Sequence, residues 1–231
     1  MIIHIGDITI DLTLKDVENI HLSVYPPEGA VKMTAPSYVS EESLKLYAIS
    51  KLSWIKKEQK KFKEQSRETK RIYVERESIY IWGQRYLLSI AQAKRPSIKY
   101  DSFNMVFFCP ENYSLEQRQS YVNRWYRKEL RKFAEPLILQ WAEKLQVQPN
   151  KLLVSTMKTK WGSCNSKDKN IRLNTELAKK PKPSVEYIIL HELLHLLEAN
   201  HGDRFVSLLD EHMPDWQQRK QMLSEMPLHF G

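Results

Sequence analysis

The residue pattern with the clearest chemical potential is a pair of histidines, His191 and His195, with Glu192 directly after the first. If this stretch is helical, the two imidazoles lie one turn apart on the same face and can bind one divalent metal ion. Glu192 then lies on an adjoining face, from which its carboxylate can act on a water at the metal without being a ligand. A catalytic zinc site has three protein ligands, and His201, six residues past His195, is the best candidate for the third.

The residues before this pattern predict the helix that must carry it. Ser184 follows two prolines and is placed to cap a helix, and Glu186 falls in the first turn. Apolar residues then recur broadly at helical spacing: Val185, Ile188, Ile189, Leu193 and Leu196. The alternative is a pair of half-exposed histidines on an amphipathic helix. The full H-E-x-x-H pattern is rarely met by chance, and the helix signals before it favour the metal site.

The first half of the chain predicts strands interrupted by one helix. Residues 1–35 are rich in β-formers, and two or three hairpins there would form a small antiparallel sheet. Ser40 then opens a helix, after which residues 72–108 return to strands with a hairpin turn near Gly83. The aromatic residues of these later strands could stack on nucleic-acid bases, but one face of a core is the favoured interpretation. No internal repeat is evident.

The second half begins with the longest helical pattern. Apolar residues recur at helical spacing from Ser114 to near Gln146, and Pro136 is expected to kink the helix or mark a second start. A protease holds an extended peptide against the edge of a sheet, and the segments Lys160–Cys164 and Ile171–Asn174 are the candidates for that edge. The strands predicted after the helix are residues 151–155, 157–164 and 171–174.

The composition describes a folded, basic protein. Its 231 residues are 42% hydrophobic and 10% aromatic, which can fill a core and argues against disorder. The net charge of +8 favours acidic partners, although Lys-rich solvated helices account for it equally well. Two cysteines make no secreted disulfide framework. Neither a signal peptide nor an apolar membrane span is evident, so a cytoplasmic location is expected.

Several motifs together resemble those of one protein family. They are Lys160–Cys164 (KWGSC), Ile171–Asn174 (IRLN), His191–His195 (HELLH), Asn200–Phe205 and Met213–Trp216 (MPDW). This set resembles the YgjP-like metallopeptidases, small zincins close to the SprT-like proteases. The metzincins share the histidine spacing but carry a glycine three residues after the second histidine, where this chain has Glu198.

The resemblance implies an α+β fold with a zincin-like metalloprotease domain, an H-E-x-x-H active-site helix and a small antiparallel sheet. We place this domain at residues 111–231, after a β-rich accessory region with one helix at residues 1–110. The implied zinc ligands are His191, His195 and His201. Glu192 is implied as the general base for hydrolysis of peptide bonds in a protein or peptide substrate.

Several alternatives stay open on the sequence alone. The rival function is a nucleic-acid-associated binding protein with a structural or vestigial zinc site; SprT-like relatives act on DNA-bound proteins. The intact Glu192 argues against a purely structural zinc. Cys164 is expected to be a buried structural thiol rather than a zinc-coordinating thiolate. Glu198 and Asp203 are expected to be surface carboxylates, the alternative being that one orients a ligand imidazole. Cobalt, nickel or manganese could replace zinc on three imidazoles.

Overall fold

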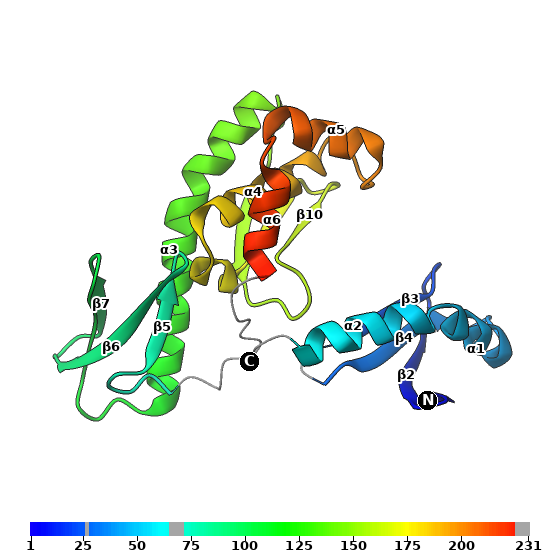
Figure 1. Cartoon of the computed structure of the whole chain (residues 1–231), viewed down its shortest axis with the longest axis horizontal. Helices are drawn as coiled ribbons and strands as arrows, with labels where there is room; N and C mark the ends of the chain where they lie inside the picture. The colour runs from blue at the N-terminus through cyan, green and yellow to red at the C-terminus, as the bar shows by residue number, and fades with distance from the viewer. Residues whose placement is uncertain (26–27, 65–71, 225–231) are drawn as a thin grey trace. The chain divides into compact units, whose positions relative to one another are not determined.

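The computed structural model describes residues 1–25, 28–64 and 72–224. The chain divides into two compact units, Met1–Arg67 and Glu68–His229. Small β-sheets and α-helices occur in both units, which confirms the predicted α+β class (Figure 1). In the part of the chain described, no helix combines the length and the apolar character needed to cross a lipid bilayer.

The smaller unit is a four-stranded sheet with two helices packed on one face. Its elements are β1 (Ile2–Ile5), β2 (Ile8–Lys15), β3 (His21–Tyr25), β4 (Ala30–Pro36), α1 (Glu41–Ser50) and α2 (Leu52–Glu64). The β2 residues Ile8, Ile10 and Leu12 are buried and alternate with exposed ones, as a half-buried strand requires. Leu44 and Ile55 from the helices join the same core. Ser40 caps α1 by accepting a hydrogen bond from the Ser43 amide, which confirms the predicted helix start.

The sheet of the smaller unit is mixed, so the predicted antiparallel sheet is wrong. Its strand order is β1-β2-β4-β3, in which two antiparallel hairpins meet through the parallel pair β2 and β4. Local turn and strand signals specify the hairpins, whereas the pairing of one hairpin with the other depends on contacts distant in the sequence.

The larger unit begins with a second sheet of the same topology. Its strands are β5 (Ser78–Ile81), β6 (Gln84–Gln92), β7 (Ser97–Tyr100) and β8 (Met105–Cys109). The order β5-β6-β8-β7 again joins two hairpins through a parallel pair, β6 and β8. Trp82 and Gly83 have φ angles of 52° and 85°, which confirms the predicted turn. In both units the sheet is followed by a helix with a serine N-cap, Ser40 or Ser114. The chain therefore repeats a topology that the sequence did not reveal.

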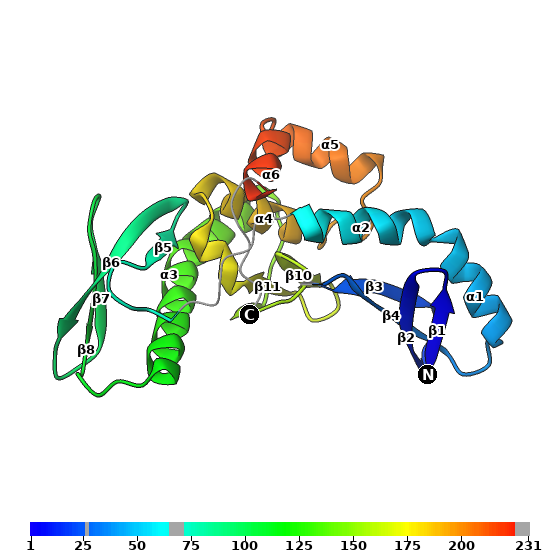
Figure 2. The ribbon, with the colours of Figure 1, turned by 60° about the horizontal axis from the view of Figure 1, so that its bottom comes forward.

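Helix α3 (Leu115–Lys144) lies between this sheet and the C-terminal half of the larger unit, as Figures 1 and 2 show. A capping box between Ser114 and Gln117 begins it. It continues through Pro136, so the predicted second start is wrong. Because proline has no N–H, the carbonyl of Lys132 loses its helical hydrogen-bond partner at Pro136. Both residues are exposed, so water can donate a hydrogen bond to that carbonyl instead.

The C-terminal half contains a three-stranded sheet and the remaining helices. They are β9 (Lys151–Ser155), β10 (Gly162–Asn165), β11 (Asn170–Asn174), the 3-10 helix η1 (Thr175–Lys179), α4 (Lys182–Leu194), α5 (Asp203–His212) and α6 (Trp216–Ser224). The order β10-β11-β9 has one antiparallel and one parallel pair, so this sheet is also mixed rather than antiparallel. β10 is an edge strand and β11 is central, so of the two candidate segments KWGSC, which enters β10 at Gly162, lies at the edge of the sheet.

The boundary between the two compact units does not fall at residue 110, where the sequence analysis placed the start of the metalloprotease domain. The two compact units separate near residue 67, and β5–β8 belong to the larger one. The reason is packing: Tyr100 makes an edge-to-face contact with Trp125 of α3, and Phe107 stacks on Tyr121. The sheet and the helix thus share one hydrophobic core.

Helix α4 carries the H-E-x-x-H residues and is fixed from two sides. Glu186 accepts hydrogen bonds from the Trp141 indole of α3 at 3.1 Å and from the Arg219 guanidinium of α6 at 2.6 Å. Ser184 is not the N-cap, so that prediction is wrong. The helix starts two residues earlier, where Pro183 favours helical φ, and Ser184 is buried inside it.

Candidate metal centre

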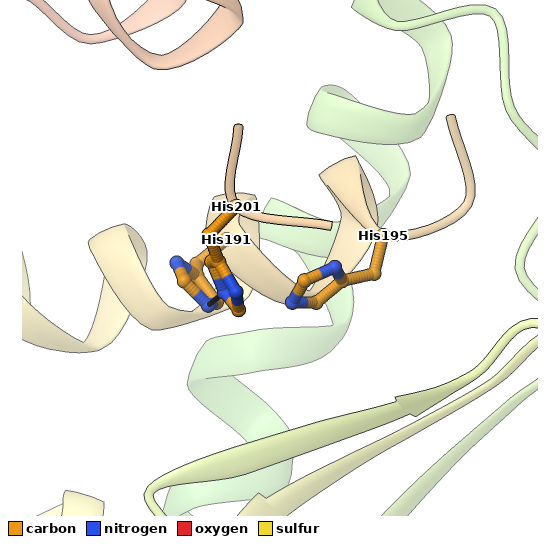
Figure 3. Close-up of side chains that lie close together, drawn as sticks. All are labelled: His191, His195 and His201. Atoms are coloured by element: carbon orange, nitrogen blue, oxygen red, sulfur yellow. Dashed lines mark hydrogen bonds between the residues drawn. The ribbon is translucent and has the colours of Figure 1, made fainter. Parts of the chain in front are cut away.

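Three histidines converge at the C-terminal end of α4. His191 lies in its last turn, His195 is its C-cap residue, and His201 lies in the segment leading to α5. The ring centroids are 5.0 Å apart for His191 and His195, 4.9 Å for His191 and His201, and 4.7 Å for His195 and His201. Figure 3 shows the three rings turned toward a common region. One nitrogen from each lies within 4.8 Å of the other two, so the trio can hold one metal ion.

Ring nitrogens of all three histidines have close polar neighbours. The Nε2 atoms of His191 and His201 are 3.0 Å apart, a distance at which they share a proton or a common ion. His195 Nδ1 lies 3.1 Å from the backbone carbonyl of Glu198, so that nitrogen donates its proton and Nε2 keeps its lone pair. The Glu198 carboxylate lies 3.8 Å from Arg204 instead. Glu198 therefore orients a ligand through its backbone, not through the side chain considered from the sequence.

A buried phenylalanine supports the three imidazoles. Phe205 of α5 is 1% exposed, and its ring centroid lies 5.0, 4.9 and 4.7 Å from those of His191, His195 and His201. Contact with all three rings limits their rotation. The N-H-G-x-x-F motif thus contains both His201 and Phe205, the residue that restrains all three imidazoles.

Burial disfavours protonation of His191 and His195. Burial, followed by the neighbouring His195 and His201, lowers the pKa of His191 to about 3. Burial also lowers the pKa of His195. Metal binding requires a free imidazole lone pair, and a site that already disfavours protonation meets this need without releasing a proton at neutral pH. The donor set therefore fits a divalent metal ion.

Glu192 is the buried carboxylate beside the trio. It is 5% exposed, and burial raises its pKa to about 7 despite the opposing charge of Lys160. It packs against Gly162 of β10 so closely that a Cβ there would lie 2.5 Å from its Oε1 atom. A carboxyl with a pKa near neutrality can both accept and return a proton at physiological pH.

These groups border an open pocket of about 450 Å³. Its lining comprises Lys160–Cys164, Ser166, Ile188, His191, Glu192, His195, Ala199 and His201. Cys164 is half-buried, and burial and the Glu192 charge raise the pKa of its thiol to about 11. The sulfur is therefore a protonated thiol at neutral pH rather than a thiolate. Asp203 is exposed at the start of α5.

Two residues shape the site in ways that the sequence analysis did not predict, Asn174 and Tyr187. Asn174 is fully buried and hydrogen-bonds the loop that leads into β10. Tyr187 stacks on Trp216 with ring centroids 6.1 Å apart and meets His191 edge-on at 5.8 Å. Burial and the Glu192 charge raise the pKa of Tyr187 to about 12. The only sequence signal for Tyr187 was its position four residues before His191, one helical turn away.

The chain is similar to two solved structures and matches one family model. Among solved structures, the chain is similar to two metallopeptidase zymogens. One is jannalysin of Methanocaldococcus jannaschii, with 23% identity over 40% of this chain and 88% of that chain, at a TM-score of 0.37. The other is abylysin of Pyrococcus abyssi, with 19% identity over 39% and 90%, also at 0.37. No curated protein matches. The model of the YgjP-like metallopeptidase domain matches residues 19–226, so the chain belongs to this family and is a metallopeptidase.

Proposed function

We propose that the chain is a zinc-dependent protease in which His191, His195 and His201 hold the ion and Glu192 is the general base. One observation carries the proposal. Three imidazoles converge beside one buried carboxylate, and all four side chains border the same open pocket. A structural zinc would favour a closed ligand shell and would need no such carboxylate.

Zinc suits the donor set better than the harder divalent cations, because imidazole nitrogens are among its preferred ligands. Held by three uncharged residues, the ion would lower the pKa of a coordinated water toward about 7 and polarise the substrate carbonyl.

Glu192 supplies the proton transfer in this mechanism. Its carboxylate accepts a proton from the attacking water and returns it to the nitrogen of the leaving amine. Burial favours this role, because it gives the carboxyl a proton affinity close to that required at neutral pH. Contact with Gly162 holds the carboxylate against the edge strand.

The edge strand suggests how the substrate is held. β10 is paired with β11 on one side and has no strand on the other in the described structure. An extended segment of a protein can add to such an edge through backbone hydrogen bonds that require no particular sequence. β10 also contributes Gly162, Ser163 and Cys164 to the pocket, so a peptide bound there would pass the metal centre.

Metal content and proteolysis measured together test this proposal. We expect wild-type protein and Glu192→Gln each to bind about one zinc per chain, and only wild type to cleave an unfolded protein substrate. Glu211→Gln makes the same chemical change on an exposed carboxylate of α5 and should cleave like wild type. Carefully prepared wild type that binds no zinc, or Glu192→Gln that retains full activity, would contradict the proposal.

A further inference from the structure

Lys160 is a positively charged residue in the lining of the pocket where we propose that the three histidines bind a metal cation. Among the residues that line the pocket, Lys160 is the one lysine or arginine and Glu192 is the one carboxylate. Lys160 lies two residues before β10, at the point where the chain enters the edge strand. Its side chain is exposed, so its ammonium group is available to a bound ligand.

The backbone at Lys160 is held firmly by the buried side chain of Asn174. The Asn174 amide nitrogen donates to the carbonyls of Met157 at 2.9 Å and of Lys160 at 2.8 Å. Its oxygen accepts from the amides of Met157 and Glu176 at 3.3 and 3.2 Å. In addition, the backbone N–H of Asn174 donates to the carbonyl of Trp161 at 2.8 Å. A fully hydrogen-bonded buried amide of this kind fixes the loop, so Lys160 starts from a defined position.

Lys160 shares this pocket with the reacting groups. It lines the same cavity as Glu192 and His195, so a ligand bound there can meet its ammonium group together with the general base and one metal ligand. A positive charge there repels a divalent cation and weakens metal binding. That repulsion is offset when a negative charge develops between the metal ligands and the base. Peptide hydrolysis generates such a charge there, on the oxygen of the substrate carbonyl.

We propose that Lys160 is a catalytic residue that stabilises the negative oxygen of the tetrahedral intermediate formed on the substrate. This inference rests on the proposed protease function. As the water oxygen bonds to the carbonyl carbon, the π electrons of the carbonyl move onto its oxygen and the water proton passes to Glu192. The ammonium group of Lys160 donates a hydrogen bond to that oxygen. When the intermediate collapses, the carbonyl re-forms, the C–N bond breaks, and the nitrogen takes the proton from Glu192.

Other donors around the pocket are less suited to this role. The hydroxyls of Ser163 and Ser166 are neutral, and a charged donor makes a hydrogen bond roughly twice as strong to an anionic oxygen. Tyr187 is 4% exposed between Trp216 and His191 and is absent from the lining. Lys160 is therefore the group whose charge and exposure fit.

The test compares Lys160→Met with Lys160→Arg and with Lys158→Met, a matched change at an exposed lysine of the same loop outside the pocket lining. Three quantities are measured on each protein: zinc affinity, the binding of a phosphinic peptide that mimics the tetrahedral carbon, and kcat and KM for a peptide blocked at both ends. For Lys160→Met we expect kcat to fall by about 10²- to 10³-fold with KM nearly unchanged, as for other oxyanion donors.

The remaining readouts separate this role from a structural one. Phosphinic-peptide affinity should fall by a similar factor in Lys160→Met, zinc affinity should be equal or higher, and Lys160→Arg should recover part of kcat. Lys158→Met should match wild type. An increase in KM alone, or a loss confined to peptides with a free C-terminal carboxylate, would overturn the inference and make Lys160 a substrate anchor. Wild-type kcat in Lys160→Met would also overturn it while leaving the protease function intact, whereas an inactive zinc-loaded wild type would remove both.

Discussion

Replacing Gly162 by alanine tests whether the edge strand holds Glu192, the proposed general base, in place. A Cβ at this position would lie 2.5 Å from Oε1, 2.7 Å from Cγ and 2.9 Å from Cδ of Glu192. Ordinary contacts of a methyl group begin near about 3.5 Å, so the carboxylate must move by about 1 Å or the strand must shift. A side-chain carboxylate moves more readily than a hydrogen-bonded strand, and the displaced group is the one that we propose transfers the proton.

The expected effect on catalysis is large and the expected effect on folding is small. Misplacing a reacting group by about 1 Å costs on the order of 10²-fold in rate, and we expect this loss in kcat. Overpacking a buried contact costs about 1–3 kcal/mol, which for a unit of this size lowers the melting temperature by roughly 2–12 °C. Zinc content should stay near one per chain, because Gly162 touches no ligand in the arrangement proposed here.

The assay is cleavage of a blocked, internally quenched peptide, with zinc content and thermal melting measured on the same preparations. Gly202→Ala is the matched control, since a Cβ at that glycine meets no atom within 4 Å. It should retain kcat. If Gly162→Ala keeps kcat within about twofold of wild type, the carboxylate is not held against the strand and the reasoning fails. Loss of zinc together with activity would equally refute it.

Three further predictions follow from the described contacts. Asn174→Ala should lower the free energy of unfolding by about 3 kcal/mol or more, because it leaves the carbonyls of Met157 and Lys160 without their donor. Urea unfolding measures this change. The control Asn165→Ala, at an exposed position, should lower the free energy of unfolding by less. In metal-stripped protein, the pKa of Glu192 rises from 4.5 to about 7 on folding, so the native state takes up a proton and this carboxyl makes stability fall as pH rises between those values. His191, whose pKa falls from 6.5 to about 3, makes stability rise with pH between those values, a window that overlaps the Glu192 window from pH 4.5 to 6.5. Between pH 5 and 6.5, the free energy of unfolding should therefore rise with pH more steeply in Glu192→Gln than in wild type, by about 1.4 kcal/mol per pH unit. Equal slopes in the two proteins would contradict this. His201→Ala should lower zinc affinity by at least about a hundredfold and abolish the rise in melting temperature on adding zinc, whereas His212→Ala should behave like wild type in competition with a chelator.

The spacing of His191, His195 and His201 was sufficient to predict that they lie together, because two of the three are linked by helix geometry alone. His191 and His195 are separated by one turn of α4, and His201 follows after a short non-helical segment, as expected. Short-range geometry also identified the Gly83 turn and the Ser40 helix start. These features depend on neighbours in the sequence.

The features that were missed depend on partners distant in the chain. The parallel pairs β2–β4, β6–β8 and β9–β11 join strands that the local pattern could only assign to hairpins. Asn174 is one polar residue at the end of a predicted strand, and its importance comes from Met157 and Lys160, 17 and 14 residues earlier. Ser184 is a residue type that often caps helices, yet α4 starts before it, at Lys182, and Ser184 is buried inside the helix.

The repeated sheet topology has a consequence for how the chain reaches its native state. Each four-stranded sheet closes only when the second strand of one hairpin finds the second strand of the next, and both units present such partners. During refolding from denaturant, a hairpin of one unit can pair with a hairpin of the other, a characteristic error of chains with similar neighbouring modules. On the ribosome, the first four strands and α1 are complete before residue 78 begins β5, so synthesis separates the two pairing steps in time. Refolding yield should therefore fall below the yield from synthesis, and expressing Met1–Arg67 separately should raise the refolding yield of the remainder.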